Sequence, residues 1–357
     1  MQKIHILIVD DAVVVRSRVT KVLSSDPRLE VVGAAANGRI ALAKIPQVNP
    51  DVVVLDIEMP EMNGLETLTA IRKTYPLLPV IMFSTLTERG AAATLEALSL
   101  GATDYATKPS NVDSMDAAIE HIRENLIPKI KVFGSGAATS QMPTVYQKSI
   151  VAPTQPLTKK VVSSPGRVEV VAIGVSTGGP NALPVVLSEF PADFPIPIVI
   201  VQHMPPTFTK LLAKRLASKS QIRVDEAVPR AVLEPGHAWI APGNFHMIVE
   251  RNGAGVRIIT HQEPPENSCR PAVDVLFRSV AEVYGGSAIA VVLTGMGQDG
   301  LRGCECIREV GGQILAQDQA SSVVWGMPGL VANTGLADKV LPLDQIGGEI
   351  MRRVFNS

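Results

Sequence analysis

The sequence predicts an α/β protein made of two domains, each built around a mainly parallel sheet. Three observations support this prediction. Short apolar runs alternate with amphipathic stretches in both halves of the chain, which is typical of βαβ units. The chain has 357 residues, enough for two separate hydrophobic cores. Between the halves the alternation fails, in a segment rich in Pro, Ser and Thr.

The first predicted domain covers residues 1–125. Its five predicted strands are Ile4–Val9, Val31–Gly33, Val52–Leu55, Val80–Phe83 and Tyr105–Ala106. The stretches between them have helical periodicity, so the strands are expected to form a parallel sheet covered on both faces. Five such repeats predict a flavodoxin-like (βα)5 domain.

Residues 126–167 are predicted to be a flexible linker. The segment contains Gly134-Ser-Gly136, several prolines, six basic residues and no acidic one. This composition favours a tether over a packed element. Its basic bias fits either a solvated linker, the more common case, or a grip on an acidic surface.

The second predicted domain covers residues 168–357. Its predicted strands are Val170–Val175, Ile198–Gln202, Ala238–Ala241, Arg257–Thr260, Ala288–Leu293 and Gln313–Ala316. Helical stretches such as Pro206–Ser218 and Pro271–Tyr284 separate several of them. A hairpin is expected around Met247–Ile259, where Asn252-Gly253 offers a turn. The domain is therefore predicted to be doubly wound, with a mainly parallel sheet.

Charge and cysteine content exclude several classes of protein. Lys plus Arg (33) nearly equals Asp plus Glu (34), so no overall field favours nucleic acid or an anionic membrane. No apolar run approaches the roughly 20 residues of a membrane span, and Asp10 cuts short the run at Ile4–Val9. Three cysteines cannot form a disulfide framework and are interpreted as reduced structural thiols. A cytoplasmic protein without direct membrane insertion is expected.

Charged and hydroxyl side chains follow the predicted strands of the first domain. They are Asp10 and Asp11, Asp56, Ser84, and Lys108. The carboxyl ends of parallel strands gather at one edge of a sheet, so these groups should converge. Three clustered carboxylates predict a Mg²⁺ site. One aspartate could then accept a phosphoryl group, with Lys108 and Ser84 stabilising the new charge. Alternatively, each acid caps the helix that follows it.

Residues 1–125 resemble a response-regulator receiver domain in three motifs: Leu7-Ile-Val-Asp10-Asp11-Ala, Leu55-Asp56-Ile-Glu-Met-Pro60, and Gly101-Ala-Thr-Asp-Tyr105-Ala-Thr-Lys108-Pro109. The resemblance implies phosphorylation of Asp56 by a histidine kinase. It also implies Mg²⁺ bound by Asp10, Asp11 and Asp56, a switch hydroxyl at Ser84, a switch aromatic at Tyr105 and a charge-stabilising Lys108.

Ser176 is the candidate nucleophile of the second domain. It lies in Gly174-Val-Ser176-Thr-Gly178, directly after a predicted buried strand. Such a Gly-x-Ser-x-Gly turn exposes a serine oxygen at the edge of a parallel sheet. The alternative is that Ser176 and Thr177 only cap a helix beginning near Pro180.

A nucleophilic serine needs a base and an acid that orients the base. His203 ends the strand expected beside Ser176, with His237 and His246 as alternative bases. Asp299 follows the strand Ala288–Leu293 but could instead be the N-cap of a helix starting at Leu301. The rival acids are Asp274, Asp318 and Asp338. Backbone N–H groups near Thr177 and Met296 could form an oxyanion hole.

Residues 168 to about 350 resemble the catalytic domain of chemotaxis protein-glutamate methylesterases. The motifs that carry the resemblance include Ile173-Gly-Val-Ser176-Thr-Gly-Gly-Pro180, Gln202-His203-Met-Pro-Pro206 and Leu293-Thr-Gly-Met-Gly-Gln-Asp299-Gly300. The resemblance implies a Ser176, His203 and Asp299 triad, with Thr177 and Met296 near the oxyanion. The chain departs from the family pattern at Ala272, often Ser, and at Trp325, where Phe or Tyr is expected.

The resemblance implies a phosphorylation-activated enzyme. Its substrates would be the glutamate γ-methyl esters and glutamines of methyl-accepting chemotaxis receptors, and its phosphodonor a chemotaxis histidine kinase. No cofactor is expected at the esterase site. Two alternatives stay open: a receiver-controlled binding module without catalysis, and a serine hydrolase acting on a different ester or amide.

Overall fold

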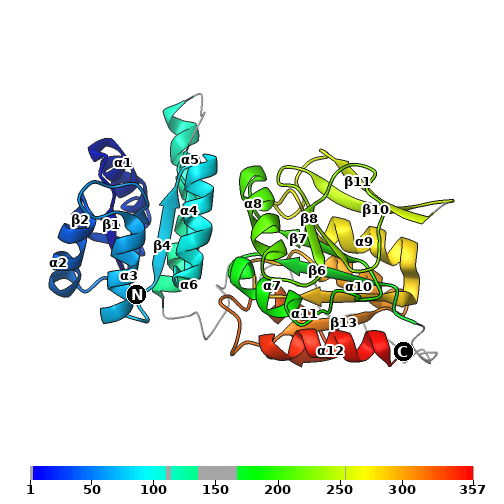
Figure 1. The fold of residues 1–357 in the computed structure, drawn as a ribbon. Coiled ribbons are helices and arrows are strands. Elements are labelled where there is room, and N and C mark those ends of the chain that lie inside the picture. The colour runs from blue at the N-terminus through cyan, green and yellow to red at the C-terminus, as the bar shows by residue number, and fades with distance from the viewer. Residues whose placement is uncertain (1–2, 110–113, 136–166, 254, 357) are drawn as a thin grey trace. The chain divides into compact units, whose positions relative to one another are not determined.

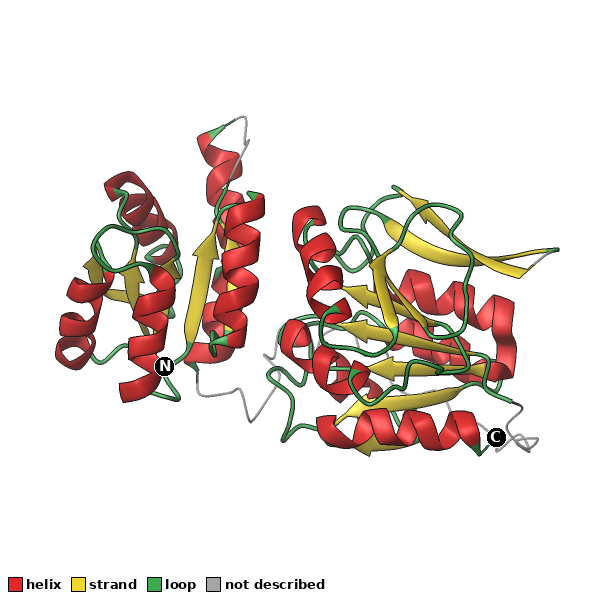
Figure 2. Ribbon diagram, in the orientation of Figure 1, coloured by secondary structure: helices red, strands yellow, loops and turns green. Residues whose placement is uncertain are grey.

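The computed structural model describes residues 3–109, 114–135, 167–253 and 255–356 of the chain. It divides into two compact units, residues 1–138 and residues 139–357. Both units are α/β, with helices flanking the strands of each sheet (Figures 1 and 2). The predicted fold class is confirmed.

The first unit contains a five-stranded parallel sheet in the order β2-β1-β3-β4-β5. Its elements are β1 (Ile4–Val9), α1 (Val13–Leu23), β2 (Leu29–Ala35), α2 (Gly38–Val48), β3 (Val52–Asp56), α3 (Gly64–Thr74), β4 (Val80–Ser84), α4 (Glu88–Ser99), β5 (Asp104–Thr107), α5 (Met115–Asn125) and α6 (Ile127–Gly134). The central strands are apolar and buried on both faces, as a doubly covered parallel sheet requires. The order reverses between β1 and β3, which makes their carboxyl ends the switch point of this sheet.

The predicted linker is wrong at its start, because α6 occupies residues that were assigned to a tether. Pro128 stands in the first turn of α6, where a missing N–H costs nothing. Ile130 and Phe133 are buried, and a side chain at Gly134 would collide with Ile4 of β1. The apolar spacing of this short helix was hidden by the Pro-rich and basic sequence that follows. The remainder of the predicted linker, residues 136–166, lies outside the described residues.

The second unit contains a seven-stranded parallel sheet in the order β14-β13-β12-β6-β7-β9-β8 and a separate antiparallel pair, β10-β11. Its elements are β6 (Val170–Val175), α7 (Gly179–Leu187), β7 (Ile198–Gln202), α8 (Pro206–Ala217), β8 (Arg223–Glu226), β9 (His237–Ile240), β10 (His246–Asn252), β11 (Gly255–His261), α9 (Val273–Tyr284), the short 3₁₀ helix η3 (Gly285–Ser287), β12 (Ala288–Val292), α10 (Leu301–Glu309), β13 (Gln313–Gln317), α11 (Met327–Asn333), β14 (Lys339–Leu341) and α12 (Leu343–Phe355).

The predicted hairpin is confirmed, since β10 and β11 pair from His246 with His261 to Asn252 with Gly255. Two edge strands of the sheet, β8 and β14, were not predicted. Arg223–Glu226 contains one apolar residue and three charged ones, and Lys339–Leu341 is short and largely exposed. Neither carries the apolar run that marks the central strands.

The chain passes from β6 to β7 on one side and later returns to β12 on the other side of β6. The carboxyl ends of β6 and β12 therefore flank the switch point of the second sheet, where ligands bind in open α/β folds. In the described parts of the chain, no helix combines the length and the apolar character needed to cross a membrane.

Candidate active site

Ser176 lies at the carboxyl end of β6, beside the switch point of the second sheet. The next turn takes a left-handed backbone at Gly178, with φ of 86°, and α7 begins at Gly179. The N-cap of α7 is Gly178, and no side chain caps the helix. The alternative in which Ser176 or Thr177 serves as a helix cap is therefore wrong.

Gln202, the last residue of β7, holds this turn in place. Its side-chain Nε2 donates a hydrogen bond of 2.9 Å to the carbonyl oxygen of Ser176, and the side chain is buried. A Cβ atom at Gly179 would lie 1.9 Å from Oε1 of Gln202. Position 179 therefore requires glycine because the amide of the neighbouring strand occupies the space of a side chain.

His203 follows Gln202 and lies at the end of the strand next to Ser176. Val175 of β6 is in register with Gln202 of β7, and the backbone N–H of His203 donates to the carbonyl of Val175 over 3.2 Å. Ser176 and His203 are thus the first residues beyond two paired strand ends. The imidazole Nε2 lies 2.8 Å from Oδ2 of Asp299, and 12% of the His203 side chain is exposed.

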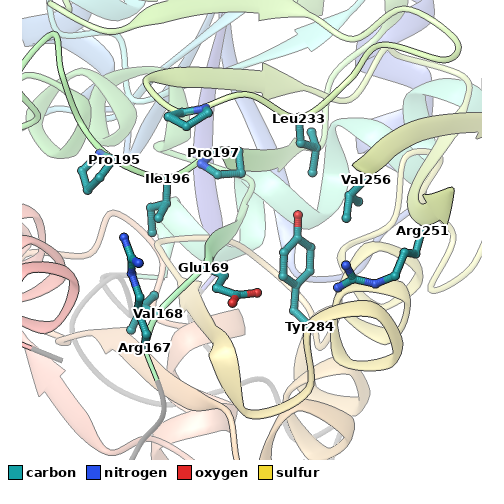
Figure 3. A pocket seen from close by; sticks show the side chains of 11 residues that line it. Arg167, Val168, Glu169, Pro195, Ile196, Pro197, Leu233, Arg251, Val256 and Tyr284 are labelled. Atoms are coloured by element: carbon teal, nitrogen blue, oxygen red, sulfur yellow. The ribbon is translucent and has the colours of Figure 1, made fainter. Parts of the chain in front are cut away.

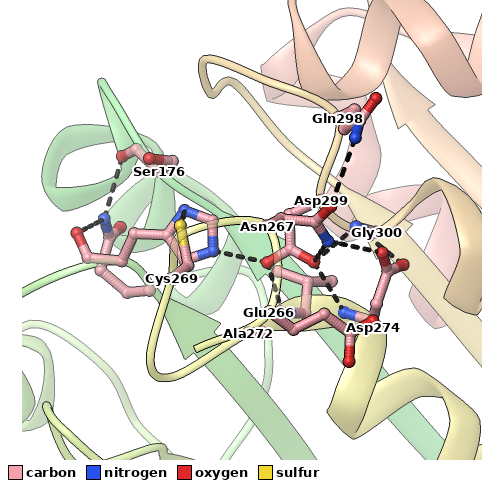
Figure 4. Close-up of polar contacts among 12 residues, drawn as sticks. Ser176, Glu266, Asn267, Cys269, Ala272, Asp274, Gln298, Asp299 and Gly300 are labelled. Carbon is pink, nitrogen blue, oxygen red and sulfur yellow. Dashed lines mark hydrogen bonds and ion pairs between the residues drawn. The ribbon is translucent and has the colours of Figure 1, made fainter. Parts of the chain in front are cut away.

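Asp299 is held by N–H donors on every side (Figure 4). Its oxygens accept hydrogen bonds from the backbone of Val273, Asp274 and Gly300 and from the side-chain Nδ2 of Asn267, over 2.6, 3.0, 3.1 and 3.0 Å. Burial would raise the pKa of Asp299, but its contacts with His203 and these backbone donors outweigh burial and lower it. Asp299 is therefore a charged, fixed partner for the imidazole.

Asp274, a rival acid in the sequence interpretation, binds the start of α10. Its Oδ1 accepts backbone N–H groups of Gly300 and Gly303, over 3.0 and 2.6 Å, at the start of α10. The N-cap of α10 is Gly300, so the alternative that Asp299 is that N-cap is wrong. Burial, together with the charge of Asp299, raises the pKa of Asp274 to about 6. Asn267 bridges the two carboxylates, donating to Asp274 Oδ2 over 2.9 Å.

The remaining rival residues have partners of their own. The ring of His237 stacks on Trp239 and contacts the carboxylate of Asp225 at 3.0 Å, and His246 contacts the carbonyl oxygen of Pro264 at 3.1 Å. Asp318 accepts from Ser321, and Asp338 pairs with Arg308. None of these contacts involves Ser176, His203 or Asp299.

The loop after β12 packs directly on the serine turn. The backbone N–H of Ser176 donates to the carbonyl of Thr294 over 3.0 Å, and the Thr294 hydroxyl donates to the carbonyl of Thr177 over 2.9 Å. A Cβ atom at Gly295 would lie 2.9 Å from Cβ of Ser176. Thr177 and Met296, the residue after Gly295, therefore belong to the two segments that meet at Ser176.

Cys269 is a neighbour of this site that the sequence interpretation missed, because it was treated as a structural thiol. Its Sγ lies 3.6 Å from Nδ1 of His203, and the residue is half-buried. Burial would lower the pKa of His203, but its interactions with Cys269 and Asp299 raise it to about 10. The supporting amides of Asn267 and Gln202 were missed as well, since nothing in the local sequence distinguishes them from loop and strand residues.

In the first unit, the three predicted acids meet at the switch point. One carboxylate oxygen each from Asp10, Asp11 and Asp56 lies within 4.8 Å of the others. Nζ of Lys108 pairs with Asp10 at 2.7 Å and with Asp56 at 2.8 Å. Burial raises the pKa of Asp56 to about 6, although Lys108 opposes this shift. The charges of Asp56 and Asp10 raise the pKa of Lys108 against the effect of burial.

The other two predicted receiver residues flank this cluster along the sheet. Ser84, at the end of β4, is buried, and its hydroxyl donates to the carbonyl of Gly90 over 3.1 Å. Tyr105 of β5 has Lys129 of α6 at 5.2 Å from the centre of its ring. The additional helix α6 therefore contacts the strand that carries the predicted switch aromatic.

A cavity of about 320 Å³ lies at the opposite edge of the second sheet (Figure 3). Its lining includes Glu169 and Pro197, which precede β6 and β7, and Arg251 and Tyr284 from neighbouring elements. None of the predicted site residues lines it. The cavity is therefore separate from the cluster at the carboxyl ends of the strands.

The fold and the two strand-end clusters define a response regulator with an enzymatic output domain. Residues 6–120 match the response regulator receiver domain family, and residues 171–350 match the CheB methylesterase family. The chain belongs to the family of CheB methylesterases that carry a receiver domain.

Relatives match over nearly the whole chain. A protein-glutamate methylesterase/protein-glutamine glutaminase of Trichodesmium erythraeum is 60% identical over 99% of this chain and 100% of its own length. One from a Nocardioides species is 51% identical over 99% and 96%. The crystal structure of the Thermotoga maritima CheB methylesterase catalytic domain matches with a TM-score of 0.51 and 42% identity, covering 52% of this chain and 99% of that one.

Proposed function

We propose that this protein is a phosphorylation-activated hydrolase. It demethylates glutamate γ-methyl esters on methyl-accepting chemotaxis receptors and deamidates receptor glutamines, in the cytoplasm. The observation that carries the proposal is the pairing of His203 with the N–H-saturated carboxylate of Asp299, at the strand end adjoining Ser176. The names of the relatives support the substrate class.

In the proposed reaction His203 takes the proton of the Ser176 hydroxyl, and the serine oxygen attacks the ester carbonyl. Methanol, or ammonia from a glutamine, leaves with the proton returned by His203. Water then attacks the acyl-enzyme by the same route and releases glutamate. Asp299 keeps its charge throughout and stabilises the imidazolium.

His203 serves as a base only in its neutral form. The contacts with Cys269 and Asp299 raise the pKa of His203, so the imidazole is competent as a base only when Nδ1, the nitrogen beside Cys269, carries no proton. Backbone N–H groups near Thr177 and Met296 are the proposed oxyanion donors. The N–H of Ser176 is excluded from this role because it is bonded to Thr294.

Phosphorylation is proposed at Asp56, with a histidine kinase as donor. The donor set of Asp10, Asp11 and Asp56 fits Mg²⁺, because the cation prefers carboxylate oxygens and these lie within 4.8 Å of one another. When bound, Mg²⁺ neutralises charge between the carboxylates and the phosphoryl oxygens. A carboxylate oxygen of Asp56 attacks the phosphorus, and the P–N bond to the kinase histidine breaks, which releases the kinase imidazole. Lys108 stabilises the added charge, and Ser84 turns its hydroxyl from Gly90 toward the phosphoryl group.

The decisive experiment measures methanol release from methylated receptor fragments, with and without a small phosphodonor and Mg²⁺. Ser176→Ala is expected to reduce the rate by about 10⁴-fold or more while Asp56 is still phosphorylated. Fluorophosphonate labelling of Ser176 in the unchanged protein distinguishes a catalytic serine from a binding module. Full activity of the Ser176→Ala variant would disprove the catalytic assignment.

A second experiment tests the regulatory part. Phosphodonor is expected to raise methanol release by the unchanged protein and to leave Asp56→Asn at its basal rate. In a phosphorylation-activated enzyme the unphosphorylated receiver is proposed to inhibit the catalytic unit, so removal of residues 1–138 is expected to raise basal turnover. A lower or unchanged rate in the truncated protein would contradict inhibition by the receiver.

A further inference from the structure

Cys269 is placed against His203 by a closed turn. Glu266 and Cys269 exchange two backbone hydrogen bonds, of 3.1 and 2.8 Å, and the residues between them, Asn267 and Ser268, have φ of 52° and 61°. Two successive left-handed residues define a tight hairpin turn with little conformational freedom. The turn thus fixes the backbone position of Cys269, whose Sγ lies 3.6 Å from the imidazole Nδ1.

The two nitrogens of His203 have different partners. Nε2 faces the charged carboxylate of Asp299 at 2.8 Å, so we assign the hydrogen to Nε2 in the neutral ring. Nδ1 is then the nitrogen that accepts a proton, and the group 3.6 Å from it is the thiol of Cys269. A thiol, an imidazole and an orienting carboxylate in this order form the arrangement of a cysteine nucleophile.

The neighbouring imidazole separates Cys269 from the other two cysteines, and exposure separates it from Cys304. Burial raises the pKa of Cys304, and burial followed by the charge of Glu309 raises that of Cys306. Cys304 is fully buried, whereas Cys269 is partly exposed. The nucleophile of a thiol reaction is the thiolate, so a proton-accepting imidazole nitrogen 3.6 Å from Sγ of Cys269 favours reaction at that position.

We propose that Cys269 is a second nucleophile served by His203, and that its oxidation by hydrogen peroxide or another small peroxide switches off the esterase. The regulatory half of this inference rests on the proposed function of Ser176. The reactivity of the thiol does not.

In the oxidation step, Nδ1 of His203 takes the thiol proton and Sγ attacks one oxygen of hydrogen peroxide. An S–O bond forms and the O–O bond breaks. The second oxygen leaves as hydroxide and takes the proton from His203 to become water. Sulfur loses two electrons and the peroxide gains them, which leaves a cysteine sulfenic acid.

The product blocks the base that Ser176 needs. The sulfenic hydroxyl adds an oxygen to Sγ, which already lies within hydrogen-bond reach of Nδ1. The new group therefore competes with the serine hydroxyl for the only nitrogen not bound to Asp299. A dithiol reductant restores the free thiol and hence the base.

The test exposes the full-length protein to hydrogen peroxide and traps sulfenic acid with dimedone, with peptide mass spectrometry reading all three cysteines. Cys269 is expected to be labelled at least about 10-fold faster than Cys306 or Cys304. His203→Ala is expected to slow this labelling at least about fivefold, with His203→Gln as a second variant should the first not fold. Labelling of Cys269 no faster than that of Cys306, or unchanged by both His203 variants, would overturn the proposal.

Methanol release is measured on the same samples, as the fraction of each protein's untreated rate. The unchanged protein and Cys306→Ser are expected to lose activity in step with labelling and to recover it with dithiothreitol. Cys269→Ser is expected to keep its own untreated rate after peroxide, and inhibition of this variant as in the unchanged protein would refute the switch. If no protein released methanol, the proposed function would fail, while the labelling rates would still decide the reactivity of Cys269.

Discussion

Asp56 and Asp299 occupy equivalent places in two parallel sheets and have opposite electrostatic environments. Asp56 ends β3 and Asp299 lies in the loop after β12, and both strands adjoin the point where the strand order of their sheet reverses. Asp299 is surrounded by N–H donors, and its pKa is lowered. Asp56 lies among two further carboxylates with one lysine, and its pKa is raised to about 6.

The contrast separates two uses of a carboxylate. Hydrogen-bond donors that match a charge make the acid stable and unreactive, which suits a residue that orients an imidazole. Burial and neighbouring acids destabilise the charge of a carboxylate. Binding a cation or forming a covalent bond relieves this cost, which suits a phosphoacceptor. The same edge of the same kind of sheet therefore supports both roles, according to the donors around it.

The largest expected effect on kcat comes from removing the charge of Asp299, the acid that its N–H donors stabilise well. Asp299→Asn is expected to lower kcat for methanol release by about 10³- to 10⁴-fold, because the amide neither stabilises the imidazolium nor fixes the ring tautomer. Phosphorylation of Asp56, measured in the same variant, serves as the control for folding of the other unit. A kcat within tenfold of the unchanged protein would show that the charge of Asp299 is not needed.

A smaller effect is expected from removing one donor of Asp299. Asn267→Ala deletes the bridge from Asp299 to Asp274 and is expected to lower kcat by about 10-fold, since a hydrogen bond to a charged group contributes about 1.5–3 kcal/mol. The matched control is Gln298→Ala, which removes only a 3.4 Å contact to Asn267. Equal losses in the two variants would mean that the turn, and not the donor, matters.

The free energy of unfolding of the receiver should depend on the charge of Asp56, the acid that its surroundings stabilise poorly. Because folding raises the pKa of Asp56, the folded unit binds more protons than the unfolded chain between pH 3.8 and about 6, and stability falls as pH rises through this window. In Mg²⁺-free buffer at pH 7, Asp56→Asn is expected to increase the free energy of unfolding by about 1–3 kcal/mol. Urea titration of residues 1–138 measures this.

The matched control for stability is Asp11→Asn. Asp11 belongs to the same cluster but is exposed, so water screens its interactions and a smaller change in the free energy of unfolding is expected. A stability gain in Asp11→Asn equal to that in Asp56→Asn would attribute the effect to mutual repulsion of the acids. It would remove burial of Asp56 as the cause.

The smallest expected effect concerns pH dependence. Cys269→Ser removes the sulfur group whose interaction raises the pKa of His203, whereas the contact with Asp299 remains. The imidazole then loses its proton at lower pH, so the acidic limb of the kcat/KM profile is expected to move toward lower pH. An unshifted or alkaline-shifted limb would contradict the contribution of Cys269 to the pKa of His203.

The sequence predicts those parts of this molecule that depend on strand ends. Asp10, Asp56, Ser176 and His203 each follow an apolar run, and parallel topology is enough to bring them to one edge of their sheet. Local pattern could not distinguish Asp299 from a helix cap, because the N–H groups that the acid accepts come partly from Val273 and Asn267, more than 25 residues earlier in the chain.

The thiol of Cys269 escaped prediction for a related reason. Its contact with His203 spans 66 positions in the chain and depends on a turn in which neither central residue is glycine. Helix α6 was missed because its apolar residues are spread over only eight positions. For both Cys269 and α6, the contacts that fix the structure join residues far apart in the chain, and neither local periodicity nor a motif predicts such contacts.

Helix α6 also determines where the protein can be divided. Ile130 and Phe133 are buried, and Gly134 packs against Ile4 and Val52, at the ends of β1 and β3 remote from Asp56. A catalytic fragment starting at residue 126 would inherit this apolar helix without its partner strands, and a receiver ending at 125 would lose the cover over Ile4. Both halves would be prone to aggregation, whereas a cut after residue 138 yields two pieces that each retain their own interior.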